Sequence, residues 1–168
     1  MTHALGVLGG TFDPPHNGHI AVAERAHVQL DLVRVLFAVA GDPPHKTERA
    51  ITPASRRIAM VELAIADHPA LALSRVDIER PGPHYTADTL ALLSQRYPAA
   101  QLYFIIGGDS LSDLPKWYRP QKILKYAYLA VMPRPDYQPD VQALEKTVPG
   151  LSERLVWLSG PPVDISAT

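Results

Sequence analysis

The sequence predicts an α/β fold, a doubly wound parallel sheet with helices on both faces. Short apolar runs alternate along the chain with segments of helical periodicity, which is typical of strands joined by crossover helices. Because such crossovers are right-handed, the helices cover both faces of the sheet. Turns rich in glycine, proline or histidine follow several of the runs. Ligands of such sheets bind beyond the carboxyl ends of the strands, so we expect the chemistry in these turns.

Six apolar runs have the length and composition of buried strands. They lie at residues 4–8, 32–40, 71–76, 101–106, 126–132 and, with a weaker pattern, 154–158. Each is a short continuous run rich in aliphatic residues, as expected for strands that are buried on both faces. The first run is followed at once by the most unusual turn in the chain.

Three segments between the runs place apolar residues on one helical face. These faces comprise Val22, Ala23, Ala26 and Leu30 in the first segment, Ala54, Ile58, Val61 and Ile65 in the second, and Leu90, Leu93 and Tyr97 in the third. We expect Thr52 and Thr86 to cap the second and third helices, with Pro53 and Asp88 in the first turns. Residues 109–114 are expected to form a short helix and residues 133–139 a proline-rich loop.

Length and composition limit the class of protein. A chain of 168 residues predicts one domain. The sequence has no cysteine, which excludes a thiol nucleophile and suits the reducing cytoplasm. A net charge of -1 gives no broad positive field, so we expect no nucleic-acid partner. No run of 18 apolar residues occurs, so we expect no membrane partner either.

The segment LGVLGGTFDPPHNGHIAVAERA, residues 5–26, has the features of a phosphate-binding turn. Gly9 and Gly10 let the backbone approach a ligand, and Gly18 lies where the helix begins. His16 and His19 would lie on one side of the first helical turn, where each can donate a hydrogen bond to phosphate. A charged imidazole there would offset negative charge in a transition state.

Two other interpretations of this segment remain open at this point. The histidines could be incidental surface residues of a Gly-Pro loop. They could also bind zinc, although the sequence supplies neither an HExxH motif nor a cysteine as a further ligand. The sequence also lacks GxxxxGK[ST] and GxGxxG, which disfavours a P-loop kinase or a dehydrogenase.

The string GGTFDPPHNGH resembles the signature of the nucleotidyltransferase superfamily that carries HxGH near its amino end. More specifically, the chain resembles bacterial nicotinate mononucleotide adenylyltransferases. PPHK at 43–46, PGPHYTADTL at 81–90, FIIGGDSLSDLPKWY at 104–118 and DISAT at 164–168 follow that family's order and spacing. The similarity covers essentially the whole chain and implies the Rossmann-like nucleotidyltransferase fold.

The resemblance implies a function for each motif. The family transfers the adenylyl group of ATP to nicotinate mononucleotide, forming deamido-NAD and pyrophosphate, with Mg²⁺ carried by ATP and no metal ligand from the protein. His16 and His19 would be the catalytic residues. The implied ATP site comprises Gly9, Gly10, Thr11, Phe12, His16, His19, Lys46, Gly107, Asp109, Arg134, Ser166 and Thr168. The implied nicotinate mononucleotide site comprises Thr86, Trp117 and Tyr118.

Two departures from the family pattern bear on activity. Residues 134–136 read Arg-Pro-Asp where the family usually has Arg-Pro-Gly, which puts a carboxylate near the triphosphate. The closing motif, IS-x-T at 165–168, is followed in the family by an arginine and a helical region. Neither occurs within the single domain of residues 1–168, and we expect them to follow Thr168 in a longer chain. If the shorter chain is real, we expect weak or no turnover.

Alternative functions remain open from the sequence alone. Another HxGH enzyme, such as a pantetheine-phosphate adenylyltransferase, would share the first turn. A non-catalytic nucleotide-binding module that kept the fold and lost the closing motif would share it as well. The sequence is compatible with a homo-oligomer but does not predict one.

Overall fold

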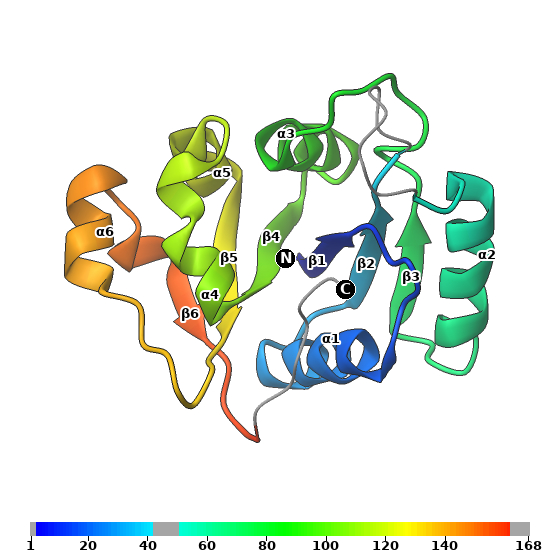
Figure 1. Ribbon diagram of the computed structural model, residues 1–168, viewed down its shortest axis with the longest axis horizontal. Helices are drawn as coiled ribbons and strands as arrows, with labels where there is room; N and C mark the ends of the chain where they lie inside the picture. Colours follow the sequence, from blue (N-terminus) through cyan, green and yellow to red (C-terminus); the bar gives the residue numbers. More distant parts are fainter. Residues whose placement is uncertain (1–2, 42–50, 162–168) are drawn as a thin grey trace.

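The computed structural model describes residues 3–41 and 51–161, whose strands form one parallel sheet in the order β3-β2-β1-β4-β5-β6 (Figure 1). The strands are β1 (His3–Gly10), β2 (Arg34–Val39), β3 (Leu71–Ser74), β4 (Ala100–Gly107), β5 (Ala127–Met132) and β6 (Leu155–Trp157). Every neighbouring pair is parallel. The predicted α/β class and parallel sheet are therefore confirmed.

Helices cover both faces of this sheet, as the doubly wound prediction requires (Figure 1). They are α1 (Asn17–Gln29), α2 (Ala54–Ile65), α3 (Thr86–Arg96), α4 (Gly108–Ser112), α5 (Pro120–Tyr126) and α6 (Val141–Thr147), with 3-10 turns at η1 (Leu114–Lys116) and η2 (Ser152–Arg154). Apolar residues of α1 and α2 join one core cluster, whereas those of α3, α4 and α5 join the other. In the described part of the chain, no helix has both the length and the apolar character needed to span a bilayer.

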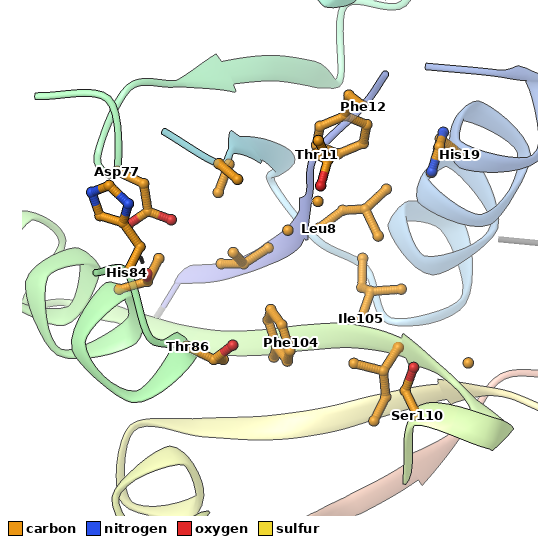
Figure 2. A pocket seen from close by; sticks show the side chains of 18 of the residues that line it. Leu8, Thr11, Phe12, His19, Asp77, His84, Thr86, Phe104, Ile105 and Ser110 are labelled. Carbon is orange, nitrogen blue, oxygen red and sulfur yellow. Dashed lines mark hydrogen bonds between the residues drawn. The ribbon is translucent and has the colours of Figure 1, made fainter. Parts of the chain in front are cut away.

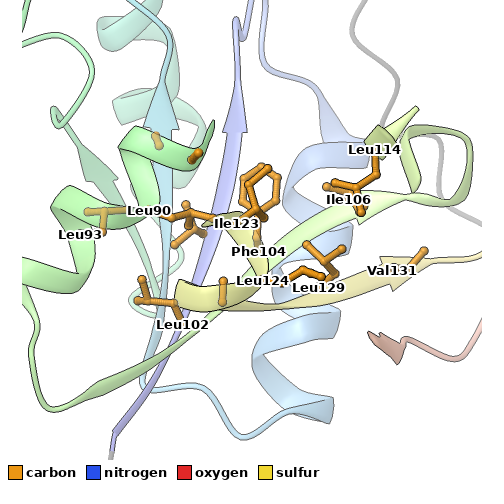
Figure 3. Close-up of a cluster of buried hydrophobic side chains, with 14 of the residues drawn as sticks. Leu90, Leu93, Leu102, Phe104, Ile106, Leu114, Ile123, Leu124, Leu129 and Val131 are labelled. Atoms are coloured by element: carbon orange, nitrogen blue, oxygen red, sulfur yellow. The ribbon is translucent and has the colours of Figure 1, made fainter. Parts of the chain in front are cut away.

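The sheet has a core on each face, because successive side chains of a strand point to opposite faces. In β4, Leu102, Phe104 and Ile106 point toward α3 and α5, where they meet Leu90 and Ile123 (Figure 3). The intervening Ile105 belongs to the opposite cluster, with residues of α1 and α2. Strands buried on both faces explain why the sequence shows continuous apolar runs rather than alternating ones.

Strand order reverses direction at β1. The chain first runs outward from β1 to β2 and β3, and then crosses back to place β4 on the other side of β1. A crevice forms where connections leave neighbouring strands in opposite directions. The carboxyl ends of β1 and β4 are therefore where this topology favours a ligand.

Three local predictions about the helices were wrong. Helix α2 begins at Ala54 with Pro53 in the capping position, so Thr52 is no N-cap; its backbone N–H donates to the Asp13 carboxylate instead, at 2.9 Å. Thr86 is the first residue of α3, after Tyr85 at the cap. Tyr97 was expected to face inward but is 41% exposed. It is the C-cap residue after Arg96 and its backbone is no longer helical, so its side chain does not continue the apolar face of Leu90 and Leu93.

Glu145 in α6 closes the turn that follows the helix. Its carboxylate accepts hydrogen bonds from the backbone N–H groups of Gly150, Leu151 and Ser152, at 2.6, 3.2 and 3.2 Å. Partial desolvation raises the pKa of this carboxyl, but the hydrogen bonds from Ser152, Gly150 and Leu151 outweigh it. The net pKa of Glu145 lies below its ordinary value of 4.5.

The lowered pKa of Glu145 predicts a stability difference that depends on pH. A carboxyl whose pKa falls on folding stabilises the native state above its unfolded pKa, and this contribution is lost as the pH drops through the folded value. We expect Glu145→Gln to lower the free energy of unfolding at neutral pH, with the difference shrinking below a pH of about 4.5. Urea unfolding across this range measures it. The exposed Glu153→Gln serves as control, and equal stability of Glu145→Gln and wild type at neutral pH would contradict the assignment.

Candidate active site

A cavity of about 360 Å³ lies at the carboxyl ends of β1 and β4 (Figure 2). Its lining includes the turn after β1, the start of α4 and the start of α3. Among the residues predicted for ATP, it contains Gly9, Gly10, Thr11, Phe12, His19, Gly107 and Asp109. Among those predicted for nicotinate mononucleotide, it contains Thr86 and Trp117. Two groups of residues predicted from separate motifs thus line one cavity.

The turn after β1 is held in an unusual backbone conformation at Phe12. This residue has φ of 52°, which places a bulky side chain in the left-handed region. The ring is 2% exposed and lies between Phe37, with centroids 5.4 Å apart, and His19, which it meets edge-on at 4.9 Å. Packing on both sides stabilises a conformation that costs energy by itself. The backbone of the turn is therefore fixed.

The two histidines form a capping box at the start of α1. Nδ1 of His16 accepts a hydrogen bond from the backbone N–H of Gly18, at 3.1 Å. Nδ1 of His19 accepts one from the backbone N–H of His16, also at 3.1 Å. The rings stack with their centroids 3.8 Å apart. His19 lines the cavity, whereas His16 stacks on His19 and is not among the lining residues.

This arrangement specifies which ring nitrogen carries hydrogen. A nitrogen that accepts a hydrogen bond has no hydrogen of its own, so each neutral ring carries its hydrogen on Nε2. Protonation at Nδ1 would remove the cap, and two charged rings stacked at 3.8 Å would repel each other. The hydrogen bonds therefore place the hydrogen of each neutral ring on Nε2, which leaves two Nε2–H donors.

Asp109 and Arg134, both predicted for ATP, form an ion pair. The carboxylate lies 3.2 Å from the guanidinium Nη1, and both side chains are about half-exposed. An exposed pair of this kind contributes little to stability, so either partner can exchange it for a ligand at small cost. Gly107 is the N-cap of the short helix that carries Asp109.

The opposite end of the cavity is aromatic. Trp117 meets Phe104 edge-on, with the ring centroids 6.2 Å apart. Tyr118 is not among the residues that line the cavity; it stacks on Tyr85 at 4.3 Å and is half-exposed. Thr86 is at the amino end of α3, where backbone N–H groups carry partial positive charge. This end suits a flat ring that carries an anionic group.

Three predicted ATP residues, Lys46, Ser166 and Thr168, lie outside the described residues. Within the described ranges, no group of three or more His, Cys, Asp or Glu side chains is placed to hold a metal ion.

A buried polar network behind α3 was not predicted from the sequence. The Thr89 hydroxyl donates to Oδ1 of Asp77 at 2.7 Å, and Arg80 donates to the same oxygen at 2.8 Å. The Nε2 of His84 donates to the carbonyl of Arg80 at 2.9 Å. Asp77, His84 and Thr89 all line the cavity. The network fixes the segment that leads into α3.

Gly41 lets this network approach the end of β2. A Cβ atom at Gly41 would lie 2.6 Å from Cε1 of His84 and 3.0 Å from the carbonyl oxygen of Asp77. A side chain at this position would have to displace the His84 ring. The sequence offers one signal for this contact, a glycine directly after the predicted strand at residues 32–40.

Comparison with known proteins decides the family. Residues 7–168 match the model of the cytidylyltransferase-like family. The chain belongs to the cytidylyltransferase-like family. Two relatives are each named "Probable nicotinate-nucleotide adenylyltransferase". The protein from Thermomicrobium roseum is 47% identical over 98% of this chain and 77% of its own length, and that from Roseiflexus sp. is 46% identical over 98% and 82%. The resemblance inferred from GGTFDPPHNGH is confirmed.

Two solved structures have a fold similar to that of the chain. The Plasmodium falciparum nicotinic acid mononucleotide adenylyltransferase complexed with NaAD gives a TM-score of 0.77 at 17% identity, covering 96% of this chain and 77% of that one. A nicotinate-nucleotide adenylyltransferase described as putative, from Vibrio parahaemolyticus, gives 0.64 at 23% identity, covering 90% of each chain. These likenesses establish the nucleotidyltransferase fold.

The capping box predicts the tautomers of His16 and His19. We expect long-range ¹H–¹⁵N NMR spectra at neutral pH to show the Nε2–H form for both rings, because each Nδ1 accepts a backbone hydrogen bond. The exposed His3 provides the reference for an unconstrained ring. An Nδ1–H form, or full protonation of both rings, would show that the capping box does not exist in solution.

Proposed function

We propose that this chain transfers the adenylyl group of ATP to nicotinate mononucleotide, forming deamido-NAD and pyrophosphate. The stacked pair of His16 and His19 carries the proposal, because both rings keep Nδ1 on a backbone N–H at the amino terminus of α1 and His19 lines the cavity. The family, the names of the relatives and the aromatic end of the cavity support it.

On the ATP side, we assign the triphosphate to the turn after β1. Backbone N–H groups of the turn after β1 and the two Nε2–H donors would contact phosphate oxygens, and the amino end of α1 would contribute its partial positive charge. We assign Lys46, Ser166 and Thr168 to the same ligand from their motifs. Gly107 and Asp109 are assigned to the adenosine part, where a carboxylate can accept hydrogen bonds from ribose hydroxyls.

On the acceptor side, we assign the pyridine ring to the face of Trp117 and its carboxylate to the backbone N–H groups near Thr86 and Tyr118. An aromatic face provides apolar contact for the ring. N–H groups at a helix amino end favour an anion over an uncharged amide. The acid is therefore the preferred acceptor.

The reaction we propose is a direct in-line displacement. An oxygen of the acceptor 5′-phosphate forms a bond to the α-phosphorus of ATP. The bond between the α-phosphorus and the oxygen that bridges it to the β-phosphorus breaks, and pyrophosphate leaves with that oxygen. The attacking phosphate is already ionised at neutral pH, so no general base is needed. His16 and His19 would stabilise the charge that develops on the phosphates, and the cavity would hold the two anions in line.

Mg²⁺ would bind together with ATP. This ion keeps several waters and binds largely through substrate phosphates, where it neutralises charge. We further propose that residues 1–168 act as one domain, in the cytoplasm, with no nucleic-acid or membrane partner.

A pyrophosphate-release assay with ATP tests the function. We expect turnover with nicotinate mononucleotide and less with nicotinamide mononucleotide, because only the acid presents a carboxylate to the N–H groups at α3. Turnover with phosphopantetheine instead would identify a different adenylyltransferase. Calorimetric binding of ATP without pyrophosphate release would indicate a non-catalytic module.

Replacing the histidines should separate catalysis from capping. We expect His16→Ala and His19→Ala each to lower turnover by about a hundredfold, as for loss of a preorganised donor. His16→Ala should also lower the free energy of unfolding by about 1 kcal/mol, whereas His16→Asn should keep the cap and still lose turnover. Full turnover in both alanine variants would refute the assignment.

Trp117→Ala tests the acceptor site. We expect the KM for nicotinate mononucleotide to rise up to about tenfold through loss of stacking, with the KM for ATP unchanged. Steady-state kinetics with each substrate varied in turn measure this. Trp157→Ala is the control, because Trp157 is half-exposed on β6 and does not line the cavity. An equal effect on both KM values would contradict the assignment.

A further inference from the structure

Arg57 in α2 is a fully buried cation beside the phosphate-binding turn. Its side chain is 0% exposed. Nε donates to the carbonyl of Thr52 at 2.7 Å, and Nη1 donates to the carbonyls of Thr11 and Ala40 at 3.0 and 2.7 Å. One guanidinium thus joins the entry to α2, the turn after β1 and the end of β2.

Two of these three carbonyls belong to residues that line the cavity, Thr11 and Ala40. The two segments are also joined directly, since the N–H of Ala40 donates to the carbonyl of Gly10 at 2.9 Å. Burying a charge is costly unless it is well hydrogen-bonded, and an apolar side chain would fill a helix position in a core without that cost. Packing of the core alone therefore does not explain a cation at this position, whereas its hydrogen bonds to residues that line the cavity do.

Peptide geometry shows what the cation does to the turn. In a trans peptide the C=O and the following N–H point in opposite directions. By holding the carbonyls of Thr11 and Ala40, Arg57 turns the N–H groups of Phe12 and Gly41 away from itself. A charged donor on the carbonyl also polarises the peptide and strengthens its N–H as a donor.

We infer that Arg57 is a positioning residue for ATP: by holding the carbonyl of Thr11 it directs the N–H group of Phe12, which lines the cavity, toward the triphosphate, and it places a buried positive charge behind this peptide. This inference rests on the proposed function, because it requires ATP in the turn. The left-handed backbone at Phe12 agrees with it, since that conformation sets the orientation of the same peptide group.

Steady-state kinetics of Arg57→Lys test the role. Lysine keeps the charge but cannot reach three carbonyls with a planar fork. We expect the KM for ATP to rise at least tenfold and the KM for nicotinate mononucleotide to stay within twofold, because the acceptor residues lie on other elements. Ile65→Ala is the matched control: it is buried on the same helix eight residues further on, about 12 Å along the axis, and should lower Tm without changing either KM. Equal KM values for ATP in Arg57→Lys and wild type would overturn the inference.

A second measurement uses the unaltered protein and holds even if Arg57→Lys fails to fold. On titration of wild type with ATP, the ¹H–¹⁵N resonance of Phe12 should shift more than those of the α3 residues. Saturation by ATP without a shift at this amide would overturn the inference. ATP binding with this shift but no pyrophosphate release would place ATP at the Phe12 amide, as the inference requires, and refute only the proposed reaction.

Discussion

The hydrogen bonds from two backbone N–H groups to the Nδ1 atoms of His16 and His19 constrain the rest of the site. They begin α1, they stack the rings 3.8 Å apart, and they leave Nε2 as the only hydrogen-bearing nitrogen of each neutral ring. The same side chains therefore serve the fold and the chemistry. Because the donors are fixed before any ligand arrives, little reorganisation is needed when charge develops on a bound phosphate.

The sheet supplies the second requirement, which is to bring two anionic substrates together. Reversal of the strand order at β1 places the turn after β1 beside the end of β4 and the start of α3. Each half of the cavity has its own buried polar support. Arg57 lies behind the turn after β1, and the network of Asp77 and Thr89 lies behind α3. Polar groups of this kind fix backbone orientation more strictly than apolar packing does, because an unsatisfied member is costly.

The sequence predicted the sheet, its helices on both faces and the edge that carries the cavity, because these depend on hydrophobic periodicity and glycine turns. It failed at the helix caps, where Thr52 was expected to use its side chain and instead donates its backbone N–H to Asp13, a partner 39 residues away. Arg57 was also missed, although it lies three residues after Ala54 and four before Val61, on the apolar stripe of α2. A charge on a buried stripe was the available signal, but its three carbonyl partners come from segments that only the fold brings together.

In the Nε2–H form, the rings of His16 and His19 donate hydrogen bonds but carry no net charge. Two stacked Nε2–H donors orient phosphate oxygens without supplying net charge, so the compensation for the substrates' negative charge has to come from elsewhere. In the proposed reaction it comes from Mg²⁺ carried by ATP, from Lys46 and from the buried cation of Arg57, which acts through peptide dipoles rather than by contact. Arg134 contributes only if its pairing with Asp109 is exchanged for phosphate, which an exposed ion pair allows at small cost. Hydrogen-bond donors and net positive charge are thus provided by different groups, and a substitution at a histidine should remove a donor without changing the net charge around the phosphates.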